Sequence, residues 1–441
     1  MSQKIPIHQL IEGLSKVGSY EPFTQSKLDL LGSAVVGATE ISQKERLVTQ
    51  QAFASFVESV AQNNEIPFID ISDSSKSLQQ SKVMCHVKQF LGYGNAGPVY
   101  AVIADGQPFA LKMYSASGLN DMIQTHGSFG LMGVLLDQGK EGAPPGLSEI
   151  GQKVLARKAK GVYGRCNRIV KIHRVGQDGD RLYLLMDLLE VDPISKVDPA
   201  QMGGDLRDLV SWMVDCAVGL CQLHVEERRL HLNIRPEAFI RKARKSGDRL
   251  PKYTFFNYPK KYVRPETSPC LNTEFIMVDH LDTSVDIADN SPKGLGTIGS
   301  WAFMPPEAIL ALLQVLRENY HRYVEERTPV ESAQTIRIKR SQMDDIWAMG
   351  VTFYQFLAGG KCPFGQPKTL ADLVHSVLLT RFDFSAIDPL FRDLVGSMLD
   401  KDPKKRFLRL LDGCPDKMQS RRVLAEAILC KLEDIALRLP A

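Results

Sequence analysis

The hydrophobic pattern of the chain changes its period once, and this change limits the folds that the chain can adopt. Between Val83 and Asp187, short runs of β-branched and other apolar residues are separated by Gly-rich or Asp-Gly turns, as between β-strands. These runs lie at 84–91, 98–104, 108–114, 169–175 and 181–187. After Asp205 the apolar residues recur at helical spacing. The pattern predicts a small strand-rich part that is followed by a larger helical part.

The segment before Val83 has a different character. Residues 1–62 show apolar residues at helical spacing, for example Ile7, Leu10 and Leu14. Residues 70–81 (DISDSSKSLQQS) are polar and rich in serine, as in a linker. We therefore expect a helical N-terminal extension and linker at 1–80, a strand-rich unit at 81–190 and a helical unit at 191–441.

Composition excludes several classes of protein. The 441 residues are 44% hydrophobic and 24% charged, which predicts a folded chain of two or three domains rather than a disordered one. No apolar run approaches the ~18 residues of a transmembrane helix, and the first residues lack the apolar core of a secretory signal. The eight cysteines form no C-x-x-C pair, which favours reduced thiols in the cytoplasm. Secretion as an effector stays an open alternative.

A glycine-rich motif and a lysine on the next strand but one suggest a phosphate site. Gly92, Gly94 and Gly97 form a G-x-G-x-x-G-x-V pattern that ends at Val99. Glycines let backbone N–H groups approach a phosphate closely. The motif is followed by a strand, whereas a dinucleotide-binding loop opens a helix. Lys112 ends the apolar strand that contains Ala110, where an anion would compensate its charge.

These motifs, and others that follow in the same order, resemble those of the eukaryotic-type protein kinase superfamily. The others are Tyr183–Leu188, His231–Ala238, Val278–Leu281, Met304–Glu307, Asp345–Gly350 and Asp402–Arg406. The resemblance covers about residues 84–410. It implies an α+β, protein kinase-like bilobal fold, with a small antiparallel β-rich N-lobe and a larger helical C-lobe. The C-lobe would carry insertions at about 241–272 and 310–340.

The resemblance also implies a binding site for ATP and Mg²⁺. Its nucleotide-binding residues would be Gly92, Gly94, Gly97, Val99, Ala110, Lys112, Met186 and Leu188. Glu149 is the candidate partner of Lys112, with a solvated helix charge as the alternative, and Asp279 is the candidate metal ligand. Asp345, His231 and an ion pair between Glu307 and Arg406 would be structural.

Two positions of the implied catalytic loop depart from the family. Asn233 stands where the family has the aspartate that orients the substrate hydroxyl, and Ala238 stands where it has a metal-binding asparagine. Arg235 replaces the lysine of the loop. Because an amide is no useful base and a methyl group binds no metal, the residues predict a pseudokinase. Such a protein would bind ATP weakly and act as a scaffold or allosteric regulator of a partner protein.

Two alternatives remain open at this stage. The chain could be an active but atypical ATP-dependent transferase, a slow protein kinase or another phosphoryl or nucleotidyl transferase, with Asp282 as a substitute metal ligand. It could also recognise a partner without any nucleotide, in which case Lys112 has no ligand.

A basic loop indicates the chemistry of one partner. Residues 241–264 contain nine Lys or Arg and one acidic residue, with five aromatic residues among them. Although the net charge of the whole chain is only +3, this segment suits an acidic protein or another anionic partner. Charge and stacking also allow single-stranded nucleic acid, which we disfavour, because a lone basic loop is usually just solvated.

Overall fold

A computed structural model of the chain describes about half of its residues, and the statements below concern these. They are residues 64–70, 82–94, 97–115, 136–137, 146–147, 168–170, 172–178, 181–189, 206–226, 228–243, 274–278, 285–286, 293–294, 303–318, 326, 337–365, 372, 375–414 and 424–439. The predicted N-terminal helices at 1–62 and the serine-rich linker, apart from its first residue Asp70, lie outside them.

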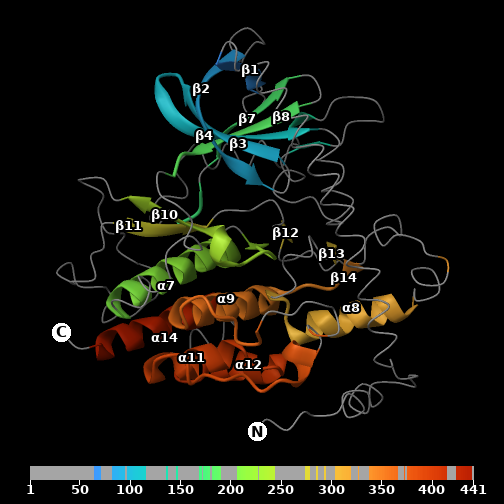
Figure 1. The fold of residues 1–441 in the computed structure, drawn as a ribbon, viewed down its shortest axis with the longest axis vertical. Helices are drawn as coiled ribbons and strands as arrows, with labels where there is room; N and C mark the ends of the chain where they lie inside the picture. The colour runs from blue at the N-terminus through green and yellow to red at the C-terminus, as the bar shows by residue number, and fades with distance from the viewer. Residues whose placement is uncertain are drawn as a thin grey trace.

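Six antiparallel strands form a closed barrel, which Figure 1 shows above a layer of helices. Around the barrel the order is β1-β2-β3-β4-β8-β7. The strands are β1 (Glu65–Asp70), β2 (Lys82–Gly94), β3 (Gly97–Ala104), β4 (Gln107–Ser115), β7 (Ile172–Asp178) and β8 (Arg181–Asp187). Strand β1 closes the barrel, because it pairs with β2 along one edge and with the end of β7 along the other.

The contacts of Phe68 explain why β1 can close the barrel. Phe68 is buried and stacks on Tyr183 of β8 with ring centroids 5.4 Å apart. Its ring also lies directly over Gly176 of β7, where an added Cβ would be 2.1 Å from the ring. Only a glycine leaves room for this approach. At the end of β1, the buried Asp70 forms an ion pair with Arg174 of β7 at 3.7 Å.

The predicted fold class is therefore wrong. The sequence predicts a protein kinase-like bilobal fold, whereas the described residues form a closed six-stranded antiparallel barrel together with several helices. No strand is predicted at 65–70, since this run of six residues contains a proline and precedes a polar segment. Its closing partner, Gly176, lies more than a hundred residues away in the sequence.

The helical part contains six α-helices among the described residues. They are α7 (Leu206–Cys221), α8 (Pro306–Glu318), α9 (Gln342–Leu357), α11 (Pro389–Met398), α12 (Pro403–Leu411) and α14 (Leu424–Arg438). Two π-helical turns, η2 (Gln222–Glu226) and η8 (His375–Leu379), and a 3₁₀ turn, η3 (Pro236–Ala238), accompany them. None of the helices that the structure describes is long and apolar enough to cross a membrane.

Short strand pairs complete the fold. Strands β10 (Phe239–Ala243) and β11 (Glu274–Val278) pair between the barrel and α7 (Figure 1). Strands of two residues form three further pairs. These are β5 (Leu136–Asp137) with β6 (Gly146–Leu147), β9 (Arg229–Leu230) with β12 (Val285–Asp286), and β13 (Lys293–Gly294) with β14 (Arg337–Ile338).

One apolar cluster spans the barrel and the helices and a second fills the barrel, because strands β4 and β8 have two buried faces. Leu111 and Tyr183 belong to the cluster inside the barrel. Their neighbours Ala110, Leu184 and Met186 belong to the cluster that also contains the buried residues of the helices. Since successive side chains of a strand point to opposite faces, β4 and β8 join the barrel to the helical layer.

Substituting alanine for either of two glycines in neighbouring helices should change the free energy of unfolding, in opposite directions at the two positions. A Cβ on Gly350 of α9 would be 2.8 Å from Cβ of Met398, so Gly350→Ala should lower the free energy of unfolding by about 1–3 kcal/mol. Gly396 of α11 has its nearest neighbour at 3.7 Å. There alanine should raise the free energy of unfolding by about 0.5–1 kcal/mol through helix propensity. Urea unfolding measures both, and a neutral Gly350→Ala would contradict the close approach of α9 and α11.

Candidate functional site

The structure brings four of the predicted nucleotide-binding residues together on one face of the barrel. Val99 of β3 pairs with Lys112 of β4, and Ala110 of β4 pairs with Met186 of β8. The alternation of side chains along β4 places Lys112 and Ala110 on the face that looks toward the helices. Ala110, Lys112 and Met186 are all buried, at 6%, 7% and 8% exposure. Leu188 follows β8 and packs against the same core.

The glycine motif forms the end of the β2–β3 hairpin, at the edge of this face. Gly92 pairs with Val99, and Gly94 pairs with Gly97. The ladder is irregular between Phe90 and Gly92, so β2 bulges just before the motif. The hairpin thus spans β2 and β3, and its second strand, β3, pairs with the strand that carries Lys112. Glu149, Asp279 and Asp282 lie outside the described residues.

The residues of this face fit a nucleotide in their chemistry. Val99, Ala110 and Met186 provide apolar side chains of the kind that contact a purine ring. Lys112 adds one cation among them, and an ammonium group is a common partner of phosphate. Among the described residues, no group of three or more His, Cys, Asp or Glu side chains is placed to hold a metal ion. The Mg²⁺ ligand Asp279 therefore stays a prediction.

The segment that resembles a catalytic loop is held by a buried carboxylate at the start of helix α9. Asp345 is fully buried and accepts three hydrogen bonds. The backbone N–H groups of His231 and Leu232 donate to it at 2.7 Å each, and Nε2 of His224 lies 2.8 Å away. The prediction that Asp345 has a structural role is confirmed by these contacts.

The backbone of this segment is strained at Leu232. Its φ of 62° lies in the left-handed region, which costs a non-glycine residue about 1–2 kcal/mol. The hydrogen bond from its N–H to Asp345 offsets this strain. Burial alone would raise the pKa of Asp345, but the hydrogen bond from His224 and the nearby His231 outweigh it and lower that pKa below its usual value. Asp345 is therefore bound in the carboxylate form that the loop requires.

At the two positions that depart from the family motif, Asn233 offers no base and Ala238 offers no metal ligand. Asn233 is buried at 6% exposure, and its N–H donates to Nδ1 of the buried His231 at 3.2 Å. Ala238 is fully buried, so only a methyl group stands at the predicted metal position. Arg235 lies 3.8 Å from Glu237 and is partly exposed. The loop therefore holds a buried amide at Asn233 and a partly exposed guanidinium group at Arg235.

A small cavity adjoins this loop. Its walls are Leu232, Asn233, Ile234, Phe303, Met304, Arg340, Asp344, Asp345 and Ala348. The cavity has room for about one water molecule. It is therefore too small for a nucleotide or a peptide side chain, and the polar residues in its mixed wall, such as Asn233 and Asp344, suit a bound water.

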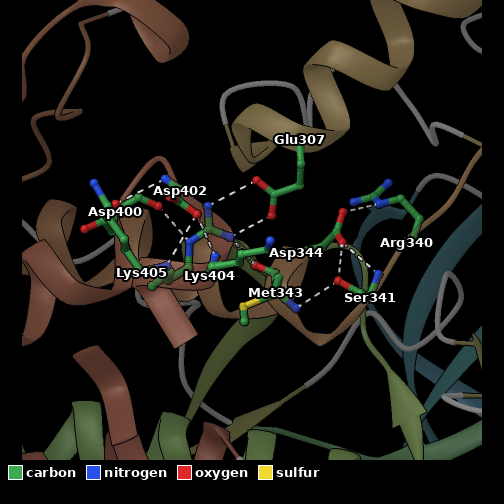
Figure 2. Close-up of polar contacts among 10 residues, drawn as sticks. Glu307, Arg340, Ser341, Met343, Asp344, Asp400, Asp402, Lys404 and Lys405 are labelled. Atoms are coloured by element: carbon green, nitrogen blue, oxygen red, sulfur yellow. Dashed lines mark hydrogen bonds and ion pairs between the residues drawn. The ribbon is translucent and has the colours of Figure 1, made fainter. Parts of the chain in front are cut away.

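The predicted ion pair between Glu307 and Arg406 is confirmed. Arg406 is fully buried, and its Nη1 and Nη2 donate to the two carboxylate oxygens of Glu307 at 2.7 and 3.2 Å. Nε of Arg406 donates to the carbonyl of Asp400 at 2.9 Å, and its guanidinium group lies 4.9 Å from the centre of the Trp347 ring. Figure 2 shows Glu307 reaching from its helix toward the segment that carries Asp400 and Asp402.

A capping box at the start of α9 was not predicted from the sequence. The N–H of Ser341 donates to Asp344 at 2.8 Å, and the N–H of Met343 donates to the hydroxyl of Ser341 at 3.2 Å (Figure 2). Arg340 also donates to Asp344. Burial raises the pKa of Asp344 despite this partner. The S-x-x-D spacing of residues 341–344 is a signal that finds such a cap.

Two further buried contacts had no usable sequence signal. His224 lies in η2 and contacts Asp345 across 121 residues of sequence. Arg168 stands in a segment, residues 157–174, with seven Lys or Arg and no acidic residue, yet it is buried and its Nε donates to Asp215 of α7 at 2.9 Å. Neither partner is marked by spacing, because the His224 contact forms only when η2 packs against α9, and the Arg168 contact only when the strand-rich and helical parts pack together.

No model of a known protein family matches the chain. The resemblance to protein kinases therefore rests on the motifs quoted above and stays a prediction.

Proposed function

We propose that the chain is a nucleotide-binding protein without phosphoryl-transfer activity, a pseudokinase in function, that scaffolds or regulates a protein partner. The observation that carries the proposal is the loop at 231–238. Asp345 holds this loop in a strained conformation, while the reactive position is the amide of Asn233. A loop that is held so firmly but lacks a base suits recognition better than catalysis.

The barrel face at Lys112 supports the nucleotide part of the proposal. The apolar Val99, Ala110 and Met186 would contact the base, and Lys112 would hold the phosphates. The glycine hairpin at 92–97 would approach the same phosphates through its backbone. Mg²⁺ would bind at Asp279. We propose weak binding, because only one of the two metal positions implied by the resemblance is kept.

The partner and the compartment are also part of the proposal. The basic segment 241–264 suits an acidic or anionic protein surface. We propose a reducing compartment, because the eight cysteines of the sequence form no C-x-x-C pair.

A thermal-shift titration with ATP tests the proposed binding. At an ATP concentration ten times the Kd, the Tm should rise by about 1–2 °C, because ligand binding stabilises the folded state. Lys112→Met keeps most of the apolar stem and should raise the Kd for ATP at least about tenfold, since it removes the charge that meets the phosphates.

The exposed Lys88 of the same barrel provides the matched control. Lys88→Met should leave the ATP-dependent shift unchanged. If millimolar ATP leaves the Tm of the wild-type chain unchanged, or if both variants lose the shift equally, nucleotide binding at this face is refuted.

A further inference from the structure

Strand β2 extends well beyond the strand that closes the barrel beside it. It has 13 residues, whereas β1 has six. The pairing with β1 ends at His86, and one hydrogen bond of 2.8 Å follows, from the N–H of Val87 to the carbonyl of Asn64. On its other side β2 stays paired with β3 as far as Gly94. Among the described strands, none runs along the β1 side of β2 after Val87, so β2 has one open edge there.

The side chains of β2 are uncovered along the same stretch. Asn64 ends the cover that β1 provides, because its φ of 51° lies in the left-handed region, in which an extended strand does not continue. All four residues of 88–91 are exposed, and Phe90 and Leu91 reach 56% and 43% exposure. A strand with one buried face exposes only every second side chain. Residues 88–91 therefore have two uncovered faces as well as an uncovered edge.

The exposed stretch combines apolar and basic side chains. Phe90 contacts the ring of Tyr100 on the neighbouring strand, with centroids 5.4 Å apart, but most of its own ring faces solvent. Lys88 forms no ion pair with any described residue, and β2 itself contains no acidic residue. A strand that carries acidic residues would therefore meet a cation here and no competing carboxylate of β2.

Strand β1 shows which kind of strand this edge of β2 accepts. It pairs antiparallel with β2, and its Glu65 forms an ion pair with His86 of β2 at 3.2 Å. Its Ile66 and Phe68 are buried, so apolar side chains alternate with others along it. A second copy of β2 fits less well, because it would bring another Lys88 to the edge, and lysine on an edge strand opposes such self-pairing.

We propose that residues 88–91 of β2 form a docking edge for an extended acidic segment of a partner protein. The segment would add a strand on the β1 side of β2, with hydrogen bonds to its backbone. An apolar side chain would lie beside Phe90, and a carboxylate would lie within reach of Lys88. The inference goes beyond the proposed function, since it requires neither nucleotide binding nor the basic segment 241–264.

Hydrogen exchange of the full chain, with and without a synthetic peptide that alternates glutamate and valine, tests the proposal. In the free chain, the amides of 88–91 on the open edge should exchange quickly, and saturating peptide should slow them at least about tenfold. The same peptide with methylated backbone nitrogens keeps its charge but cannot donate hydrogen bonds, so it should give no protection.

Three results of this experiment would overturn the proposal. Slow exchange throughout 88–91 in the free chain would mean that the chain itself covers the edge. Protection confined to 241–264 would mean that the peptide binds the basic segment instead. Absence of protection at millimolar peptide would mean that the edge accepts no acidic strand.

Two variants test the contacts one by one. Phe90→Ser should raise the Kd of the acidic peptide about three- to fivefold, because an apolar cross-strand neighbour is lost. Lys88→Glu should raise that Kd about three- to tenfold and should lower the Kd of a peptide that alternates lysine and valine. The matched control is Lys82→Glu on the part of β2 that β1 covers, about 20 Å away along the strand. It should change either Kd less than about twofold, because salt screens charges at this distance.

Two further outcomes decide between this partner and its alternatives. Equal weakening of the acidic peptide by Lys88→Glu and Lys82→Glu would mean general electrostatic attraction and would overturn the proposal. Sedimentation of the free chain tests the second copy, and we expect no dimer that depends on this edge. A dimer of the wild-type chain that Phe90→Ser dissociates would show that a second copy occupies the edge, and the proposed acidic partner would be wrong.

Discussion

Replacing Asp345 with asparagine should lower the free energy of unfolding by about 3–5 kcal/mol, the cost of breaking a buried charged contact. The carboxylate accepts hydrogen bonds from His231, Leu232 and His224, and all of these donors are shielded from water around it. Asparagine has one side-chain oxygen instead of two. Its NH₂ group would take the place of the second oxygen and would face hydrogen-bond donors that it cannot accept from. Chemical denaturation of the variant and the wild-type chain measures the loss.

The exposed Asp393 provides the matched control. Its side chain is 75% exposed and forms surface ion pairs with Arg409 and Lys431 at 3.4 and 3.7 Å. Asp393→Asn should change the free energy of unfolding by less than about 1 kcal/mol, since exposed ion pairs contribute little. Equal losses in the two variants would mean that Asp345 does not anchor the loop.

The stabilisation by Asp345 should also depend on pH. Its pKa is lowered in the folded protein, so its contribution is present above the pKa of the unfolded carboxyl, near 3.8. It is lost as the pH falls through the lowered, folded pKa. The difference in unfolding free energy between wild type and Asp345→Asn should therefore be constant from about pH 7 to pH 5 and shrink below about pH 4. A difference that already shrinks between pH 7 and pH 5 would point to another titrating group.

Replacing Arg406 with alanine should cost about 3–5 kcal/mol, because the change removes a fully buried guanidinium group together with all its hydrogen bonds. Glu307 loses both donors, the carbonyl of Asp400 loses its donor, and Trp347 loses the cation above its ring. Arg406→Lys should recover less than half of the loss, since one ammonium group cannot replace the planar fork that binds both oxygens of Glu307.

Arg409 lies in the same helix and provides the control for this variant. Its side chain is 44% exposed and pairs with Asp400 and Asp393 at 3.2 and 3.4 Å. Arg409→Ala should cost less than about 1 kcal/mol. A small loss for Arg406→Ala in the same urea series would contradict the structural role of the Glu307–Arg406 pair.

The sequence predicts individual contacts of this protein better than it predicts the fold. Glu307 and Arg406 are 99 residues apart, yet each stands in a recognisable motif, so their pairing could be predicted. The face that joins Val99, Ala110 and Lys112 follows from the alternation of two neighbouring strands. Strand β1 could not be found in this way, because its place depends on the fit of Phe68 over Gly176 of a distant strand.

The residues that hold the loop at 231–238 also differ in how far the sequence predicts them. Asp345 stands in a motif, and its structural role is predictable from it. His224 has no motif, because it meets Asp345 only through the packing of η2 against the start of α9. The buried pair of Arg168 and Asp215 likewise has no motif that predicts it, because the two residues are 47 positions apart and meet only in the packed fold.

Incubation of the full chain with Mg²⁺ and ATP labelled at the γ-phosphate, alongside ATP labelled at the α-phosphate, tests the central claim most directly. At ATP concentrations that saturate the thermal shift, we predict no label on the chain or on added acidic and hydroxyl-containing proteins above the level of Lys112→Met. Transfer of either label by the wild-type chain, abolished by Lys112→Met and by Asp279→Ala, would contradict the claim and show an active transferase.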